Sequence, residues 1–307
     1  MVPWPEFRAT ITNVKSSCCS ASPIQSRIVS ASLVEISSAV APTAAHSTAF
    51  SRSSPNSSSA EFRASSKSPV SGAQLWVANY DGSDPTPLTE ATGRAQGAPR
   101  WSPDGRWILY SSQEDDGHRD ISVIGAAGGS PRRVTGDFFD SGQGSWSRDG
   151  KWIYFGSSRT GRYEVWRIAF GPSSETEQVT TTGGFAAFES WDGQTLYYTR
   201  TNALDGPVFA RSIANGSERQ IADSVYRWDF APVDAGTYYI TRPEPQRRPT
   251  AFELRLLDYS SGQSVVLNRF ESLDVIGLTV SPDRQTIVTS GIRTVAGDDL
   301  MLIQNFR

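Results

Sequence analysis

The sequence is poor in the residue types that most often carry catalysis and metal binding. Its 307 residues include only two histidines and two cysteines. The cysteines are the neighbours Cys18 and Cys19, and one peptide step is shorter than the usual Cα separation across a disulfide. From residue 73 onward there is no cysteine, so that part depends on neither disulfides nor thiolate chemistry.

Other absences exclude further classes of protein. No apolar run approaches the roughly 18 residues that a membrane span needs, so we expect no span in this chain. The net charge is −3, which offers no basic surface for nucleic acid. The sequence starts with neither a basic segment nor an apolar one, so no signal peptide is visible.

The first 72 residues differ in composition from the rest. They contain 20 serines but no aspartate, and their single glycine is Gly72. The other 25 of the 26 glycines, and every aspartate, follow. The chain therefore joins two polypeptides of different composition.

A repeat of about 45 residues runs through the second part. Its anchor is Trp-Ser-Pro-Asp-Gly-Arg-Trp at 101–107, echoed by Trp-Ser-Arg-Asp-Gly-Lys-Trp at 146–152. The anchor aspartates are Asp104, Asp149, Asp192, Asp234 and Asp283, with a degenerate copy at Asp234. Four and six residues after each anchor stand mostly apolar residues, the alternation typical of a β-strand. Val134-Thr135 and Val179-Thr180 recur thirty residues after their anchors.

Each unit divides into four short strands separated by turn residues. Four antiparallel strands at this period are typical of a β-propeller blade. We therefore predict an all-β fold, a β-propeller of about six blades with the first one incomplete or damaged. The final unit shows three strands, so ring closure needs a fourth from elsewhere. The repeated tryptophans are expected to pack between blades.

The anchor residues themselves have a structural explanation. Proline fixes its own φ, aspartate bonds nearby backbone amides, and glycine adopts a positive φ at the corner. We assign this role to Ser102, Pro103, Asp104, Gly105, Asp149, Gly150, Asp192, Gly193, Pro282 and Asp283. Because the aspartates fall in separate blades, the turn role is favoured over a carboxylate array.

The turn and the aromatic strand after it resemble the repeat of TolB-like propellers, relatives of WD repeats. The segment Ser-Arg-Thr-Gly-Arg-Tyr-Glu-Val-Trp at 158–166 is similar to the second hairpin of that family. The chain's closing residues, 299–307, resemble the end of propellers that follow bacterial winged-helix regulators and serine/threonine kinases. The resemblance implies a binding module, and it suggests a periplasmic location.

The repeat also sets a domain boundary. Residues 54–307 are assigned to the propeller, and residues 1–53 to a Ser/Ala-rich leader. Two interpretations of the leader stay open: it is disordered, or its reading frame is wrong upstream of about residue 60. The second rests on Ser54-Pro55-Asn56, which stands where the repeat expects Ser-Pro-Asp.

Candidate chemistry is sparse. There is no Gly-x-Ser-x-Gly elbow; His46 lies in the leader and His118 in a loop. Glu114, Asp115 and Asp116 with Asp120 form an acidic cluster that could hold Ca²⁺, but its spacing is irregular, and a solvated hairpin tip is favoured. Asp298-Asp299 is weaker still as a metal site. The basic, proline-flanked Arg247-Arg248 loop is a recognition element or an exposed linker.

These observations predict a binding module with no catalytic, cofactor or metal residues. The expected partner is another protein or a small ligand at a propeller face, with no nucleic acid and no cofactor. Its context would be the sensory part of a truncated regulator or kinase, or an envelope protein. The alternative is a propeller-bearing hydrolase remnant or a propeller lyase.

Overall fold

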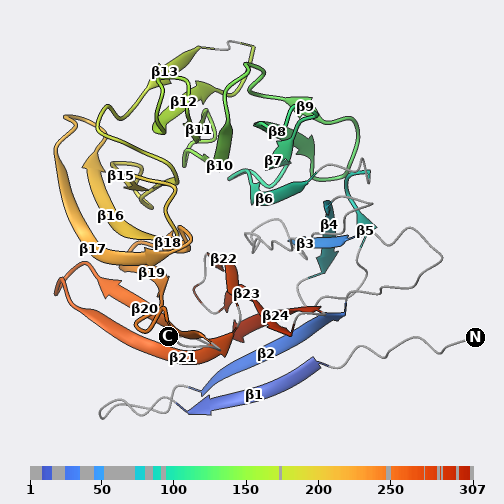
Figure 1. The fold of residues 1–307 in the computed structure, drawn as a ribbon, viewed down its shortest axis with the longest axis vertical. Helices are drawn as coiled ribbons and strands as arrows, with labels where there is room; N and C mark the ends of the chain where they lie inside the picture. The colour runs from blue at the N-terminus through green and yellow to red at the C-terminus, as the bar shows by residue number, and fades with distance from the viewer. Residues whose placement is uncertain are drawn as a thin grey trace, which may run out of the picture.

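The computed structural model consists of β-strands arranged as sheets around a ring (Figure 1). It describes residues 9–15, 25–34, 45–51, 73–79, 86–90, 95–172, 175–246, 250–272, 274–281, 284, 286–294 and 297–304. In these ranges the predicted four-stranded antiparallel blades are confirmed. The fold is therefore an all-β propeller.

Four blades are complete, and each is ordered as in the sequence from its first to its fourth strand. The first contains β6 (Gln96–Trp101), β7 (Trp107–Gln113), β8 (Arg119–Gly125) and β9 (Arg132–Arg133). The second contains β10 (Ser141–Trp146), β11 (Trp152–Ser157), β12 (Glu164–Ala169) and β13 (Thr176–Gln178). The third contains β14 (Ala187–Glu189), β15 (Thr195–Thr199), β16 (Asp205–Ser212) and β17 (Glu218–Tyr226). The fourth contains β18 (Phe230–Pro232), β19 (Gly236–Thr241), β20 (Thr250–Asp258) and β21 (Ser264–Ser272).

The two other sheets depart from this pattern. One has three strands, β3 (Ala45–Ser51), β4 (Ala73–Asn79) and β5 (Thr86–Pro87), and its β3–β4 pair is parallel. The other has five: β1 (Ala9–Lys15), β2 (Gln25–Val34), β24 (Gly297–Gln304), β23 (Thr286–Thr294) and β22 (Asp274–Val280). The estimate of about six blades is therefore wrong for the described residues. It counted turn motifs, whereas a blade also requires four antiparallel strands.

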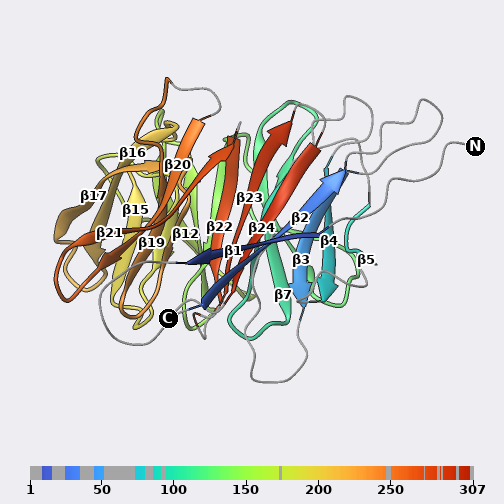
Figure 2. The same ribbon diagram turned by 90° about the horizontal axis from the view of Figure 1, so that it is seen from below.

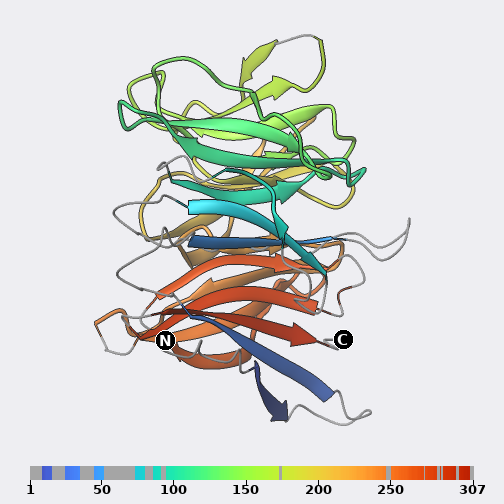
Figure 3. The ribbon, with the colours of Figure 1, turned by 90° about the vertical axis from the view of Figure 1, so that its right-hand side faces the viewer.

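The ends of the chain meet in the five-stranded sheet. Strand β2 pairs antiparallel with β24, and β1 pairs with β2. Figures 2 and 3 show these N-terminal strands, in blue, beside the red C-terminal ones. The N-terminal segment thus supplies β2 as the fourth strand of the final unit. The domain boundary at residue 53 stays a prediction, and Ser54-Pro55-Asn56 lies outside the described residues.

Apolar side chains fill the spaces between neighbouring sheets. Between the first two blades, Leu109 and Ile121 pack with Trp146, Ile153 and Phe155, and Trp107 and Trp166 lie against this cluster. Burial on both faces explains why the second strands are almost continuously apolar rather than strictly alternating. The packing role expected for Trp146, Trp107 and Trp166 is confirmed.

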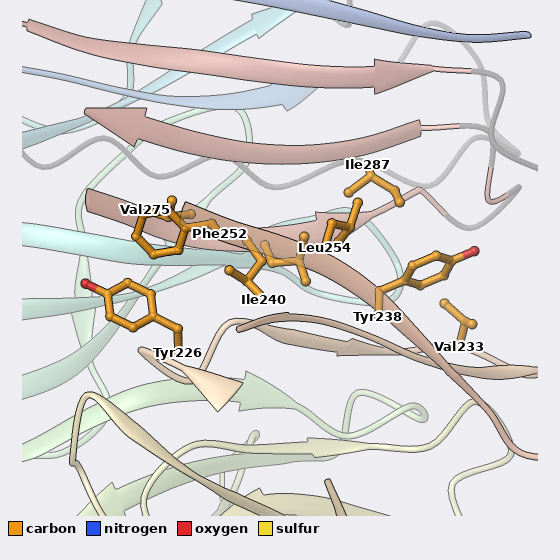
Figure 4. Packing of buried hydrophobic residues seen from close by; sticks show 9 residues of the cluster. Tyr226, Val233, Tyr238, Ile240, Phe252, Leu254, Val275 and Ile287 are labelled. Atoms are coloured by element: carbon orange, nitrogen blue, oxygen red, sulfur yellow. The ribbon is translucent and has the colours of Figure 1, made fainter. Parts of the chain in front are cut away.

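A second cluster joins the fourth blade to the last sheet, as Figure 4 shows in close-up. It contains Tyr226, Val233, Tyr238, Ile240, Phe252, Leu254, Val275, Leu278 and Ile287. Side chains of this size each contribute roughly 1.5–3 kcal/mol when buried. The contact between neighbouring sheets therefore contributes substantially to the stability of this fold.

The innermost strands carry a bulge that the sequence pattern did not predict. The register of β6 against β7 shifts between Gly97 and Arg100, and that of β10 against β11 shifts between Gly142 and Ser145. Ala98 and Gln143 occupy equivalent places in these bulges and have positive φ values of 52° and 53°. A non-glycine residue in this conformation is held there by the surrounding structure.

Antiparallel pairing gives the ring two different ends. We call the turn face the end that carries the turns between first and second strands. The opposite end, the connection face, carries the hairpins between second and third strands and the connections from one blade to the next. Every complete blade contributes to both.

Candidate functional site

The residues predicted for the repeat turn lie on the turn face and bond to one another. In the second blade, Ser147 Oγ donates to Asp149 Oδ1 at 2.7 Å, and the same oxygen accepts from Lys151 N at 3.0 Å. Ser147 Oγ also accepts from Trp152 N at 2.8 Å. Gly150 forms the corner with φ 70°. The carboxylate thus satisfies groups of its own turn.

The same arrangement recurs in two other blades. Ser102 Oγ and Ser190 Oγ each donate at 2.5 Å to Asp104 and Asp192 respectively, and Gly105 and Gly193 have φ values of 68° and 69°. Within the described residues the turn role of this motif is therefore seen three times. Pro282 and Asp283 lie outside the described residues. Pro103 lies within them and is exposed.

The later copies of the turn are different. Among the described residues, Asp234 accepts from its neighbour Ala235 N, at 2.8 Å, and from the guanidinium of Arg284, at 2.9 Å. Arg284 stands where the other copies have glycine, and it has a φ of 57°. The last unit therefore retains the glycine-type corner conformation with an arginine.

The acidic cluster predicted around Glu114 is divided by the structure. Asp116 is in the exposed hairpin between β7 and β8, whereas Asp120 is in β8 and fully buried. His118 lies between the two carboxylates. Its Nδ1 contacts Asp116 Oδ1, and its Nε2 is 3.3 Å from Asp120 Oδ2. The grouping of Asp120 with the hairpin tip was wrong, because its side chain points into the blade.

Asp120 has two further partners, both from the region of the fourth strand. Thr135 Oγ1 donates to Asp120 Oδ1 at 2.7 Å and accepts from Ile121 N at 2.9 Å. Arg133 forms an ion pair with Asp120 Oδ2. The carboxylate therefore connects the start of the third strand to the end of the fourth.

The second blade repeats this arrangement with different residues. Thr180 Oγ1 donates at 2.7 Å to Glu164 Oε2, which also accepts from Gly183 N at 2.9 Å. Arg162 Nε donates to Glu164 Oε1 at 2.6 Å. The Val-Thr columns are visible in the sequence, but the buried carboxylates that the threonines bind were not predicted. The signal was an acidic residue 15 or 16 positions before each threonine.

The loop between β9 and β10 presents two phenylalanines on the connection face. The exposed fractions of Phe138 and Phe139 are 90% and 43%. Ser141 Oγ donates to Phe139 O at 3.4 Å. No column of the repeat contains these residues, so the sequence pattern did not predict their exposure.

Ionic and hydrogen-bonding contacts fix this loop on both sides of the phenylalanines. Asp137 Oδ2 is 2.8 Å from Arg159 of the second blade. Asp140 Oδ1 accepts from Arg119 N at 2.9 Å, and its other oxygen accepts from the Tyr163 hydroxyl. Burial, together with this bond to Asp140, raises the pKa of Tyr163 to about 12, so the phenol stays protonated as a donor.

A cluster of charged and polar side chains also lies on the connection face, between the third blade, the fourth blade and the five-stranded sheet. Tyr226 donates to Asp274 at 2.5 Å, and Arg227 Nη2 is 2.7 Å from the same carboxylate. Arg242 Nε lies 2.9 Å from both oxygens of Asp205, and its guanidinium lies over the Tyr226 ring. These charged groups pair with one another across neighbouring sheets, so the cluster links those sheets.

The connection face also has a shallow cavity of about 320 Å³ at the second blade. It is lined by Thr160, Gly161, Arg162, Glu164 and Gln178. Its hairpin is the one that holds Asp137 through Arg159. The cavity and the phenylalanine loop therefore both contact the hairpin between β11 and β12.

Across the ranges described above, no group of three or more His, Cys, Asp or Glu side chains has an arrangement that could hold a metal ion. No helix in those ranges is long and apolar enough to cross a bilayer. The Arg247-Arg248 loop lies outside them.

Comparison with solved structures gives the same fold. TolB from Acinetobacter baumannii has a TM-score of 0.61 at 19% identity; the match covers 78% of this chain and 63% of that one. A gluconolactonase from Xanthomonas campestris, XC5397, also has a TM-score of 0.61, at 14% identity, with 90% and 89% covered. At such identities the likeness concerns the fold alone. This chain spans less than two thirds of that TolB.

The sequence comparisons place the repeat in a family. No curated protein matches this chain. The model of the TolB beta propeller domain matches residues 52–235, more than half of the sequence. That range includes the three turns with a common geometry and both buried-carboxylate sites. The chain belongs to the TolB beta propeller domain family.

Proposed function

We propose that this protein is a non-catalytic module that binds another protein through its connection face. The phenylalanine loop at Phe138 and Phe139 would be the anchor of the interaction. The observation that carries the proposal is a pair of exposed aromatic side chains on a loop that is fixed on both sides.

Physical reasoning supports this anchor. An exposed phenylalanine leaves a large apolar area in water, and aromatic side chains dominate the energetics of protein interfaces. The contacts of Asp137 and Asp140 hold the loop before binding, which reduces the entropy that association must remove. A small ligand would instead need an enclosed pocket, and the cavity at Arg162 is shallow.

The absence of catalysis is part of the proposal. Both ring nitrogens of His118 are engaged by carboxylates, and Arg133 Nη2 lies 3.4 Å from Nε2. A histidine general base needs a free nitrogen facing a nucleophile. The alternative of a hydrolase remnant predicts turnover of ester or lactone substrates by the purified chain, which an assay with both substrate types would detect. The alternative of a propeller lyase predicts elimination instead, which would be detected as an unsaturated product.

Two contexts would suit such a module. One is the sensory part of a regulator or kinase; the other is an envelope protein of the TolB type, in the periplasm. The DNA around the start codon distinguishes them. An upstream frame that encodes a winged helix or kinase supports the first context, and one that encodes a signal peptide supports the second.

The binding proposal is tested with matched surface variants. The wild-type protein, the double variant Phe138→Ser/Phe139→Ser and the control Trp191→Ser are used as baits in extracts of the source cell, with quantitative mass spectrometry. Trp191 is 52% exposed, but on the turn face. We expect a specific partner that is lost from the double variant and retained by the control. Equal recovery by all three baits would contradict the proposal.

A further inference from the structure

Among the differences between the buried-carboxylate sites of the first two blades, one residue changes their response to pH. The hairpins at 114–120 and 158–164 correspond position by position, and Gly117 and Gly161 have φ values of 91° and 87°. In the second blade the cation two residues before the buried acid is Arg162. In the first blade it is His118.

This difference matters because arginine stays charged at every physiological pH, whereas histidine loses its charge near neutrality. Arg162 therefore supports Glu164 permanently. His118 bears two hydrogens on nitrogen only when it is protonated, and only then can it donate to Asp116 and Asp120 together. The neutral ring can keep one of these bonds.

The first-blade site also holds the phenylalanine loop. Thr135, at the start of the connection, donates to Asp120, and Asp140, at its end, accepts from Arg119 N. His118, Arg119 and Asp120 are consecutive, so a single short segment contacts both ends of the connection. A change at His118 is transmitted directly to that segment.

We propose that His118 is a protonation-dependent clamp that holds the Phe138–Phe139 loop in its binding conformation at acidic pH and releases it as pH rises. The clamp changes the order of this loop in the protein without any partner. Its effect on partner binding rests on the proposed function.

The charges around His118 favour this direction. The hairpin contributes Asp116, β8 contributes Asp120, and β9 contributes Arg133, so two carboxylates oppose one guanidinium. Burial opposes the charged ring, but the bonds and charges of the two carboxylates outweigh it and raise the pKa of His118. A raised folded-state pKa stabilises the clamped form below the ordinary histidine value, and this stabilisation is lost as pH rises through the folded-state pKa.

The test is amide hydrogen exchange of residues 136–140 between pH 5.5 and 8.5, corrected for intrinsic exchange. We expect the protection of these amides to fall severalfold in the wild-type protein as His118 deprotonates, a step followed by its NMR resonance. The connection at 181–184, next to Glu164, is the internal control and should show no such change. The variant His118→Arg should keep the 136–140 protection high at both pH values.

The outcomes separate this inference from the proposed function. Loop protection that is the same at both pH values in the wild-type protein, or that changes equally in His118→Arg, would overturn the clamp. That result would leave partner recovery by the Phe138 and Phe139 baits unaffected. Conversely, failure to recover a partner would overturn the binding proposal while the exchange result stands.

Discussion

Thr180 and Glu164 are joined by a buried hydrogen bond that connects the end of the second blade's fourth strand to the start of its third. The threonine hydroxyl donates to the carboxylate at 2.7 Å and accepts from Val165 N at 2.8 Å. Thr135 and Asp120 form the same link in the first blade. The outer strands are only two or three residues long there, so this bond supplements a short ladder.

Removing the Thr180 hydroxyl should therefore destabilise the protein. In Thr180→Val, both Glu164 Oε2 and Val165 N lose a buried partner, and we expect the free energy of unfolding to fall by about 1–3 kcal/mol. Urea denaturation followed by tryptophan fluorescence measures the loss. Thr180→Ser keeps the hydroxyl and is the control. A valine variant as stable as the serine variant would show that the bond contributes nothing.

A second prediction concerns the corner glycine of the repeat turn. Gly150 has a φ of 70°, and among the described residues a Cβ there would meet only Pro103 Cδ, at 3.8 Å. The cost of Gly150→Ala therefore comes from the left-handed backbone alone, about 1–2 kcal/mol. Gly171 has open space and no such φ, so Gly171→Ala should change stability much less. Equal effects of the two substitutions on the denaturation midpoint would contradict this explanation.

The third prediction concerns coupling between the second and third blades. Glu189 is buried in the third blade and accepts from the Tyr154 hydroxyl at 2.7 Å and from Arg148 N at 2.7 Å. In a double-mutant cycle with Tyr154→Phe and Glu189→Gln, we expect an interaction free energy of about 1 kcal/mol. Strictly additive unfolding free energies would show that the two blades are not coupled through this pair.

The fourth prediction concerns acid stability. Bonds from the Ser190 hydroxyl and from Gln194 N lower the pKa of Asp192. A carboxyl with a lowered folded-state pKa stabilises the fold above its unfolded value, near 3.9, and the stabilisation is lost as pH falls through the folded-state pKa. Asp192→Asn should therefore weaken the decrease in unfolding free energy between pH 5 and pH 3. The same slope in both proteins would contradict this.

The repeat made much of the fold predictable from the sequence. The turn aspartates and glycines bond within their own turn, so short segments such as 102–107 contain all the information needed. Each of the four complete blades has one anchor aspartate, Asp104, Asp149, Asp192 or Asp234, between its first and second strands. Local chemistry determines both features, because turn and strand preferences depend on neighbouring residues.

Features that depend on distant residues could not be predicted in this way. The exposure of Phe138 follows from where the connection leaves the ring, and the burial of Asp120 follows from Thr135 and Arg133, which come from another strand. The bulges at Ala98 and Gln143 have no signal in the residue type, because alanine and glutamine seldom adopt a positive φ. The phenylalanine loop and the buried carboxylates were therefore not predicted, although the threonines that bind those carboxylates form a visible column of the repeat.

Site-specific photocrosslinking tests the central claim, that the connection face binds a protein through its phenylalanine loop. A photoreactive phenylalanine analogue is placed at position 138 or, as a control on the turn face, at the exposed position 191, and the source cells are irradiated. We predict a crosslinked species of discrete mass from position 138 that is absent from position 191 and is lost when Phe139→Ser is added. Crosslinks from position 191 alone, or from neither position, would contradict the account.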